Sequence, residues 1–178
     1  MTQTQTLCNG KWLRLMKRGR WEYAERTNPG GGVMIIALTD ADKLLFVEQP
    51  RPAIQCMTIE MPAGLVGDVA SHADENAIDA ARRELLEETG YHAGRIDFLT
   101  EGPTSAGMSN EILAFVLARE LTRVDGGGGD DTEEIIVHEV PRGEVMAWLL
   151  RLMGEGYSID PKIFAGLYLL DHAAQFTA

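Results

Sequence analysis

The feature that most constrains the fold is one amphipathic helical segment that stands among short, strand-like apolar runs. Residues 74–89 place apolar side chains at helical spacing, and Gly90 then ends the segment. The apolar positions are Ala77, Ile78, Ala81, Leu85 and Leu86. Continuous apolar runs at 33–38 and 44–47 predict buried strands before this helix.

Further elements follow the same reasoning. We expect strands at 57–61, 96–100, 112–117 and 134–140, and helices that start at Pro141 and Pro161 and end near 153 and 172. The runs 33–38 and 44–47 flank a turn and are expected to form a hairpin. The glycine run 126–129 is expected to form a flexible loop tip. Strands, one helix, more strands and then helices predict an α/β protein, an α/β/α sandwich with a mixed sheet.

The N-terminal part of the chain has a different character. Residues 11–27 read as two short strands around a turn at Lys17-Arg18-Gly19, and this is the only basic stretch. The sequence Asn-Pro-Gly-Gly-Gly at 28–32 separates this stretch from the rest of the chain. We therefore expect an N-terminal antiparallel strand appendage, 1–29, and a main domain, 30–178.

Composition excludes several classes of function. The net charge of −11 repels polyanions, which argues against nucleic acid or acidic lipid as a partner. No apolar run approaches the roughly 20 residues of a membrane span, and the polar start shows no secretory signal. Two cysteines, Cys8 and Cys56, make neither a disulfide framework nor a zinc site. We expect reduced thiols and a cytoplasmic location.

The helical segment also carries a cluster of carboxylates. Glu84 and Glu88 are four residues apart and share one helix face, and Glu87 borders the same patch. Like charges at this spacing repel, and a divalent cation turns the repulsion into ligation; Mg²⁺ prefers such oxygen donors. The alternative is a solvated acidic face that Arg82 and Arg83 neutralise.

The wider context favours the metal site. Gly64, Glu75 and the run Arg83-Glu84-Leu85-x-Glu87-Glu88-x-Gly90-Tyr91 together resemble the box of the Nudix hydrolases, a metal-binding loop–helix–loop. The family places five residues between the glycine and the first glutamate, whereas ten separate them here, so residues 66–73 resemble an enlarged loop. The resemblance covers about residues 20–172 and implies the Nudix fold.

Other segments resemble the ADP-ribose pyrophosphatase branch of that family. They are 47–51, 59–64, an altered Ser-Pro-Gly-x-x-x-Glu segment at 105–111 with Ala106 in place of proline, and an acidic catalytic loop within 130–138. The glycine run before this loop is expected to give it mobility.

The resemblance implies a role for each matching residue. The metal ligands would be the Ala63 carbonyl, Glu84, Glu87, Glu88 and Glu133. Glu87 would ligate a metal or orient the attacking water, Glu133 would complete a metal site or act as the base, and Asp131 is the competing base. Arg83 would pair with a box carboxylate.

Substrate contacts follow from the same resemblance. Arg51 would contact the pyrophosphate, Met108 and Glu111 would line the distal sugar side, and Glu60 would fix the nucleoside or the 62–64 turn. Candidates for stacking on the base are Trp21, Tyr23 and Arg26, with plain packing of the appendage as the alternative. The branch forms homodimers that exchange N-terminal segments, so a homodimer is expected.

The resemblance thus implies a hydrolase of nucleoside diphosphate sugars that uses Mg²⁺, with Mn²⁺ as the alternative. ADP-ribose is the first choice of substrate, giving AMP and ribose 5-phosphate. GDP-mannose, NADH and dinucleoside polyphosphates are alternatives with the same linkage. The second functional hypothesis is a Nudix-fold regulator that binds nucleotide without cleaving it. The third is an enzyme for nucleotide-pool cleaning or RNA decapping. The intact glutamates and the acidic surface oppose these last two.

Overall fold

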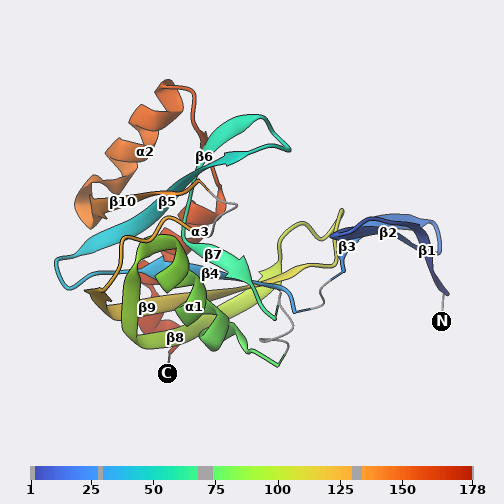
Figure 1. Ribbon diagram of the computed structural model, residues 1–178, viewed down its shortest axis with the longest axis horizontal. Coiled ribbons are helices and arrows are strands. Elements are labelled where there is room, and N and C mark those ends of the chain that lie inside the picture. The colour runs from blue at the N-terminus through green and yellow to red at the C-terminus, as the bar shows by residue number, and fades with distance from the viewer. Residues whose placement is uncertain (1–2, 28–29, 68–73, 130–133, 178) are drawn as a thin grey trace.

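The computed structural model describes residues 3–27, 30–67, 74–129 and 134–177, which form three sheets and three α-helices (Figure 1). An N-terminal antiparallel sheet has the order β1 (Thr4–Asn9), β2 (Leu13–Arg18), β3 (Trp21–Arg26). The second sheet has the order β10 (Ile136–Pro141), β5 (Lys43–Arg51), β6 (Cys56–Glu60), β11 (Ser158–Ile159). The third has the order β7 (Ala63–Leu65), β4 (Gly32–Ala37), β9 (Ile112–Arg123), β8 (Tyr91–Pro103).

The helices are α1 (Ala77–Thr89), α2 (Val145–Gly154) and α3 (Lys162–Asp171), with short 3-10 turns at Arg142–Glu144 and Ala173–Gln175. In both four-stranded sheets most pairs are antiparallel, but β4 pairs in parallel with β9 and β6 with β11. The expected mixed sheet is therefore confirmed. None of the helices in the described residues is both long and apolar enough to cross a membrane.

The hairpin expected from the runs 33–38 and 44–47 is wrong. β4 lies between β7 and β9, whereas β5 lies between β10 and β6 in the other sheet. A single bridge between Leu38 and Leu44 joins the two strands at the turn. β4 pairs with β7 and β9, whereas β5 pairs with β6, the next strand in the chain, and with the distant β10. The edges that a β4–β5 hairpin would use are therefore taken by other strands.

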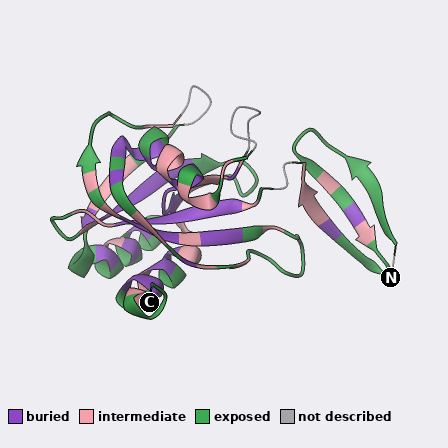
Figure 2. Cartoon of the chain, turned by 90° about the horizontal axis from the view of Figure 1, so that it is seen from below, coloured by how far each residue is buried: buried purple, intermediate pink, exposed green. Residues whose placement is uncertain are grey.

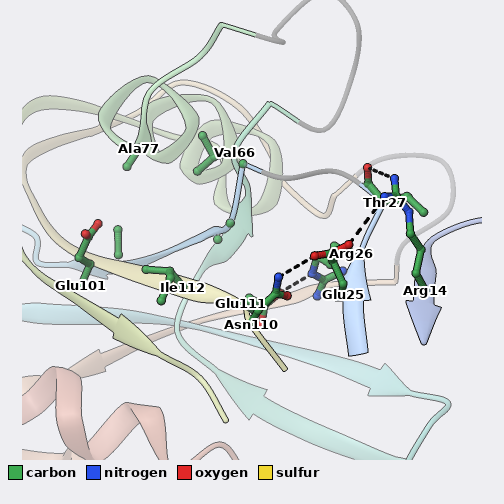
Figure 3. Close-up of a pocket in the computed structure, with 14 residues that line it drawn as sticks. Arg14, Glu25, Arg26, Thr27, Val66, Ala77, Glu101, Asn110, Glu111 and Ile112 are labelled. Carbon is green, nitrogen blue, oxygen red and sulfur yellow. Dashed lines mark hydrogen bonds and ion pairs between the residues drawn. The ribbon is translucent and has the colours of Figure 1, made fainter. Parts of the chain in front are cut away.

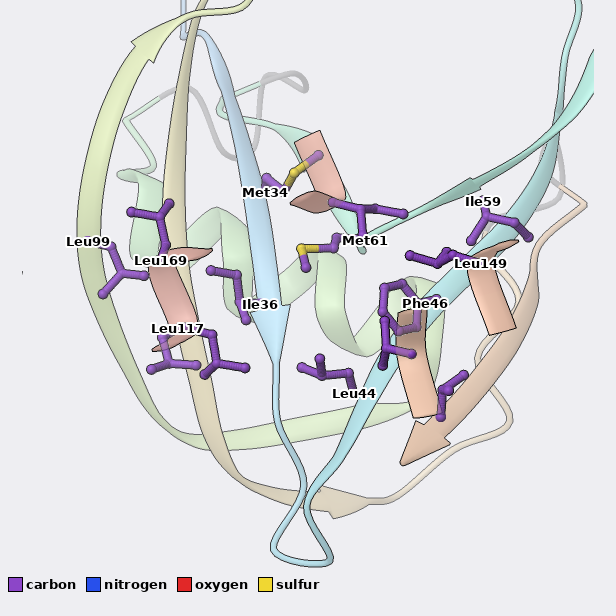
Figure 4. Packing of buried hydrophobic residues seen from close by; sticks show 14 of the residues in the cluster. Met34, Ile36, Leu44, Phe46, Ile59, Met61, Leu99, Leu117, Leu149 and Leu169 are labelled. Atoms are coloured by element: carbon purple, nitrogen blue, oxygen red, sulfur yellow. The ribbon is translucent and has the colours of Figure 1, made fainter. Parts of the chain in front are cut away.

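Both faces of the sheets are covered. One buried cluster takes Met34 and Ile36 of β4 together with residues of β5, α2 and α3, and Figure 4 shows part of it. The other takes Val33 and Ile35 of the same strand together with β9 and α1. Helix α1 thus packs on one side and α2 and α3 on the other, which is the expected sandwich and explains why β4 is apolar at every position.

Helix α1 begins later than predicted. The side chain of Asn76 caps it by accepting from the N–H groups of Ile78 and Asp79 at 2.9 and 3.1 Å, so residues 74–76 precede the helix. Gly90 ends it in the left-handed conformation, with φ 73°. The buried face includes Ala80, Ala81 and Leu85, whereas Leu86 is exposed.

The glycine run 126–129 is not a loose loop tip as far as the structure describes it. The N–H groups of Gly128 and Gly129 donate to the carbonyl oxygens of Glu88 and Glu87 at 2.8 and 3.1 Å. These carbonyls belong to the last turn of α1. The run therefore lies against the C-terminal end of the helix.

The N-terminal sheet projects from the rest of the molecule (Figures 1 and 2). Sequence analysis predicted β2 and β3 and missed β1, whose polar residues show little strand pattern. The Ala24 N–H donates to the Met108 carbonyl at 2.8 Å, which ties β3 to the loop before β9. The division into 1–29 and 30–178 stays a prediction.

Candidate active site

A cavity of about 410 Å³ opens between α1 and the ends of both four-stranded sheets. Seven of the residues predicted as metal or substrate contacts line it: Arg51, Glu60, Ala63, Glu84, Glu87, Glu88 and Glu111. They come from β5, β6, β7, α1 and the loop before β9. The fold thus brings together residues that are up to sixty positions apart in the sequence.

The wall formed by α1 and β7 depends on a close approach. A Cβ atom on Gly64 would lie 1.9 Å from the Glu84 Cδ atom, so only glycine lets the carboxylate occupy this place. Next to it, the Ala63 N–H donates to Glu88 Oε2 at 3.0 Å, and Glu88 is buried. The backbone of β7 therefore holds two of the box carboxylates side by side.

Arg83 lies among the carboxylates of this wall. Its guanidinium contacts Glu75 at 3.0 Å, Glu84 at 2.9 Å and Glu87 at 3.1 Å, and it donates to the Leu65 carbonyl at 3.1 Å. Burial alone would lower the pKa of Arg83, but the hydrogen bond to Glu75 and the charge of Glu84 raise it above its ordinary value. The predicted pairing of Arg83 with a box carboxylate is present, and Arg83 stays charged.

The chemistry of this wall fits a hard divalent cation. Its donors are carboxylate oxygens of Glu84, Glu87 and Glu88 and the carbonyl of Ala63, the oxygen set that Mg²⁺ takes. Across the described ranges, no three His, Cys, Asp or Glu side chains converge closely enough to bind a metal as they stand. The guanidinium of Arg83 balances Glu84 and Glu87 instead. The donors are of the right kind and lie in the same cavity.

Arg51 is a basic side chain in the lining of the same cavity. Arg51 donates to both oxygens of Glu60, at 2.6 and 2.7 Å, and the Thr58 hydroxyl donates to the same carboxylate at 2.6 Å. Burial raises the pKa of Glu60, but Arg51 and Thr58 outweigh it, with help from the charge of Lys162, and hold the pKa below its ordinary value. Glu60 therefore fixes the orientation of Arg51 at the cavity.

Sequence reasoning did not identify Lys162 as a site residue. It is the first residue of α3, lines the cavity, and pairs with Asp160 at 2.5 Å. Nothing local in the sequence marks it, because its position depends on how α3 packs on the sheets. Arg26, proposed from sequence for base stacking, also lines the cavity and pairs with Glu111.

A second cavity, of about 580 Å³, adjoins the first. Arg26 and Glu111 line both, so their ion pair stands where the two meet. Figure 3 shows side chains of the N-terminal sheet and of the loop before β9 along this cavity. The polar ones among them include Arg14, Glu25, Thr27 and Asn110. Asn110 donates to Glu25 at 2.8 Å, which helps to hold β3 against the loop.

Comparison with known proteins decides the family. The family model described as the NUDIX domain matches residues 28–155. The chain belongs to the Nudix family. This confirms the family and the hydrolase class that the box predicted, and α1 is the helix of the Nudix box.

Several curated proteins are similar to this Nudix chain. The methanol dehydrogenase activator of Bacillus methanolicus is 29% identical over 75% of this chain and 73% of its own length. The ADP-ribose pyrophosphatase of Bacillus subtilis is 31% identical over 68% of this chain and 63% of its own. The GDP-mannose pyrophosphatase of Pectobacterium atrosepticum is 36% identical over 66% and 55%.

A solved structure confirms the Nudix fold. The crystal structure of an ADP compounds hydrolase superposes with a TM-score of 0.72 and covers 97% of this chain and 92% of its own. The two sequences are 19% identical, so the likeness concerns the fold.

Three predicted residues of this Nudix site lie apart from the cavity or outside the described residues. Met108 is not among the residues that line it, and its side chain is largely exposed on the loop that contacts β3. Asp131 and Glu133 lie outside the described residues, so both stay predictions, as does the enlarged loop at 66–73 beyond residue 67. Trp21 is exposed and Tyr23 is buried within the N-terminal sheet.

Proposed function

We propose that this protein hydrolyses the pyrophosphate of nucleoside diphosphate sugars with Mg²⁺, and that ADP-ribose is its preferred substrate. The observation that carries the proposal is the cavity of about 410 Å³ that is lined both by box carboxylates on α1 and by Arg51 on β5. Hydrolysis of a diphosphate requires positive charge around the phosphate oxygens. This cavity supplies the side chains of Arg51 and Lys162, and carboxylates that would bind divalent cations. Water adds to one phosphorus, the bridging P–O bond breaks, and AMP and ribose 5-phosphate leave.

The chain's own residues divide the work. Glu84, Glu87, Glu88 and the Ala63 carbonyl would hold Mg²⁺, or Mn²⁺ in its place, and the bound cation would neutralise phosphate oxygens and lower the pKa of the attacking water. Gly64 gives Glu84 the space it needs. We assign the general base to Glu133, with Asp131 as the competitor.

Arg51 binds the diphosphate in this proposal. Its side chain is 45% exposed. The two hydrogen bonds to Glu60 fix the orientation of the guanidinium plane. A planar guanidinium suits a phosphate better than a lysine ammonium does. Lys162 lines the same cavity and adds a second positive charge.

The second cavity supports the choice of a substrate with two large halves. It adjoins the first at the Arg26–Glu111 pair and is large enough for a nucleoside or a sugar. In this arrangement Glu111, which lines both cavities, contacts the distal sugar, and Arg26 contacts the base. Trp21, which is exposed, remains a candidate for stacking on the base of a substrate bound to a partner chain, whereas Tyr23 is buried within its own sheet.

We further propose a homodimer. The three-stranded N-terminal sheet is too small to bury its own apolar side chains, and five of them are exposed: Leu7, Trp12, Leu13, Leu15 and Trp21. A second copy of the chain would cover them. The unpaired thiols of Cys8 and Cys56 support a cytoplasmic location.

A substrate panel tests the choice of ADP-ribose. ADP-ribose, GDP-mannose, NADH and diadenosine polyphosphates are incubated with the protein and Mg²⁺, and products are identified by mass. We expect ADP-ribose to give the highest kcat/KM. GDP-mannose is the second candidate, because a GDP-mannose pyrophosphatase is among the similar proteins. Turnover of GDP-mannose with none of ADP-ribose overturns the first choice and keeps the chemistry.

A further inference from the structure

The last turn of α1 is held by backbone groups from a distant segment. The N–H of Gly128 donates to the Glu88 carbonyl at 2.8 Å, and the N–H of Gly129 donates to the Glu87 carbonyl at 3.1 Å. Just beyond, the Val124 N–H donates to the Gly90 carbonyl at 2.9 Å. The final carbonyls of a helix have no partner within it, so these bonds satisfy groups that water would otherwise solvate.

Only glycine fits this contact. A Cβ atom on Gly127 would lie 2.4 Å from the Thr89 carbonyl carbon and 2.7 Å from the Glu88 oxygen. Its φ of +66° is also one that other residues rarely adopt. Gly126 differs in both respects, since a Cβ there meets nothing within 4 Å and its φ is not positive. The close approach therefore belongs to Gly127 and not to the whole run.

The turn held in this way carries two of the box carboxylates. Glu87 and Glu88 both line the cavity, and their own carbonyls are the acceptors of the glycine N–H groups. Helix ends fray within their last turn, and a frayed turn would let these side chains drift. Side chains that bind a cation must keep their geometry to within a fraction of an ångström.

We propose that Gly127, Gly128 and Gly129 form a backbone clamp that positions Glu87 and Glu88 for cation binding. These glycines are not among the residues that line the cavity, so the clamp acts through the helix end. This inference rests on the proposed function only in taking α1 as the cation site. Its rival is a structural role alone, in which the contact stabilises the fold and leaves cation affinity unchanged.

Two variants and a matched control test the clamp. Gly127→Ala removes the close approach, and Gly126→Ala adds the same methyl group to the neighbouring residue in open space. Gly128→Ala is measured alongside, because its Cβ has room, with the Ile135 carbonyl oxygen nearest at 3.9 Å, while its φ of +114° strains the clamp. It carries the test if Gly127→Ala does not fold.

The first measurement is hydrogen–deuterium exchange of the full, metal-free chain, and the second is calorimetric titration with Mn²⁺. In Gly127→Ala we expect faster exchange at the amides of Gly128 and Gly129 and Mn²⁺ affinity about 10-fold lower or more, the usual effect of losing a group that orients metal ligands. Gly126→Ala should match the wild type in both. Under conditions where both variants are fully folded, hydrolysis by Gly127→Ala should recover as the Mg²⁺ concentration rises, because a weakened cation site fills again at higher concentration.

Each outcome decides one question. Equal Mn²⁺ affinity in the wild type and in folded Gly127→Ala, or in Gly128→Ala if the first variant does not fold, overturns the clamp and leaves the proposed function intact. A wild type that takes up no divalent cation overturns the proposed function itself. Lower affinity in Gly127→Ala with an unchanged Gly126→Ala supports the clamp.

Discussion

At the scale of single residues, the site depends on the contacts of Gly64 and Arg83, two residues of the Nudix box that are not themselves proposed metal ligands. The Glu84 carboxylate occupies the space that a side chain at residue 64 would need, and the guanidinium of Arg83 balances the charge of three surrounding carboxylates. The box therefore specifies packing as much as ligands. Its glycine and its arginine hold the glutamates in place.

Replacing Gly64 tests this packing. In Gly64→Ala the new methyl group forces the Glu84 carboxylate to move, and we expect kcat/KM to fall about 10- to 100-fold, since small displacements at a reacting centre are costly. Gly102→Ala is the control, because a Cβ there meets nothing within 4 Å. Steady-state kinetics on both variants gives the answer, and equal activity would show that Glu84 has no fixed role.

The ion pair between Arg51 and Glu60 predicts a dependence of stability on pH. The folded-state pKa of Glu60 lies below the ordinary value of 4.5, so the pair stabilises the fold above that pH and the contribution is lost as pH falls through the folded pKa. Urea denaturation should show the wild type more stable than Glu60→Gln at pH 7, with the difference shrinking below pH 4.5. A difference that stays constant over this range would contradict the assignment.

Much of the site could be predicted from residues alone, for a physical reason. Glu84, Glu87 and Glu88 share a helix face because of helical spacing, whereas Ala63, the first residue of β7, was expected only from the resemblance to the Nudix box. Lys162 could not be predicted, because only the packing of α3 brings it to the cavity. The glycine contact with α1 was missed for the same reason, since a glycine run reads as a loop in any sequence.

At the scale of elements, α1 is set by its two ends. Asn76 caps the first turn, and Gly90 with the glycine run holds the last. Gly90 was recognised from the sequence as the end of the helix, whereas the cap at Asn76 was not, and the start was placed three residues early. Strand pairing was harder to predict, because β4 pairs with β9 and β5 with β10, both far away in the sequence, and the two adjacent runs read as a hairpin.

The N-cap gives a prediction that separates stability from catalysis. Asn76→Ala removes the acceptor for the N–H groups of Ile78 and Asp79 and should lower the free energy of unfolding by about 1 kcal/mol. Asn76→Ser keeps a cap and should lose less. Because Asn76 does not line the cavity of the carboxylates, kcat and KM should stay unchanged in both. A large loss of kcat in folded Asn76→Ala would show that the start of α1 also matters for the chemistry.

At the scale of the whole molecule, the N-terminal sheet is the part with several apolar side chains that a single chain does not bury. It contacts the body through the loop before β9. Many of its residues are exposed (Figure 2), and several of these are apolar. The main body, by contrast, has two buried clusters that cover both faces of its sheets. The two parts therefore differ in how far they can be stable alone.

The proposed homodimer is tested by charge at this sheet. Leu15→Glu puts a carboxylate on the exposed apolar surface, and we expect sedimentation to show dimer for the wild type and monomer for the variant. Leu150→Glu, at an exposed leucine of α2, is the matched control and should stay dimeric. Monomeric wild type at micromolar concentration would refute the dimer.

The central claim is that the carboxylates of α1 seat a divalent cation that makes a diphosphate hydrolysable. The direct test is release of AMP from ADP-ribose with Mg²⁺ by the wild type, by Glu88→Gln and by Glu155→Gln, a charge-matched control at an exposed glutamate just after α2. We predict turnover by the wild type and the control, its loss by a factor of at least about 100 in folded Glu88→Gln, and none with a chelator present. Wild-type turnover by Glu88→Gln, or turnover that survives chelation, would contradict the account.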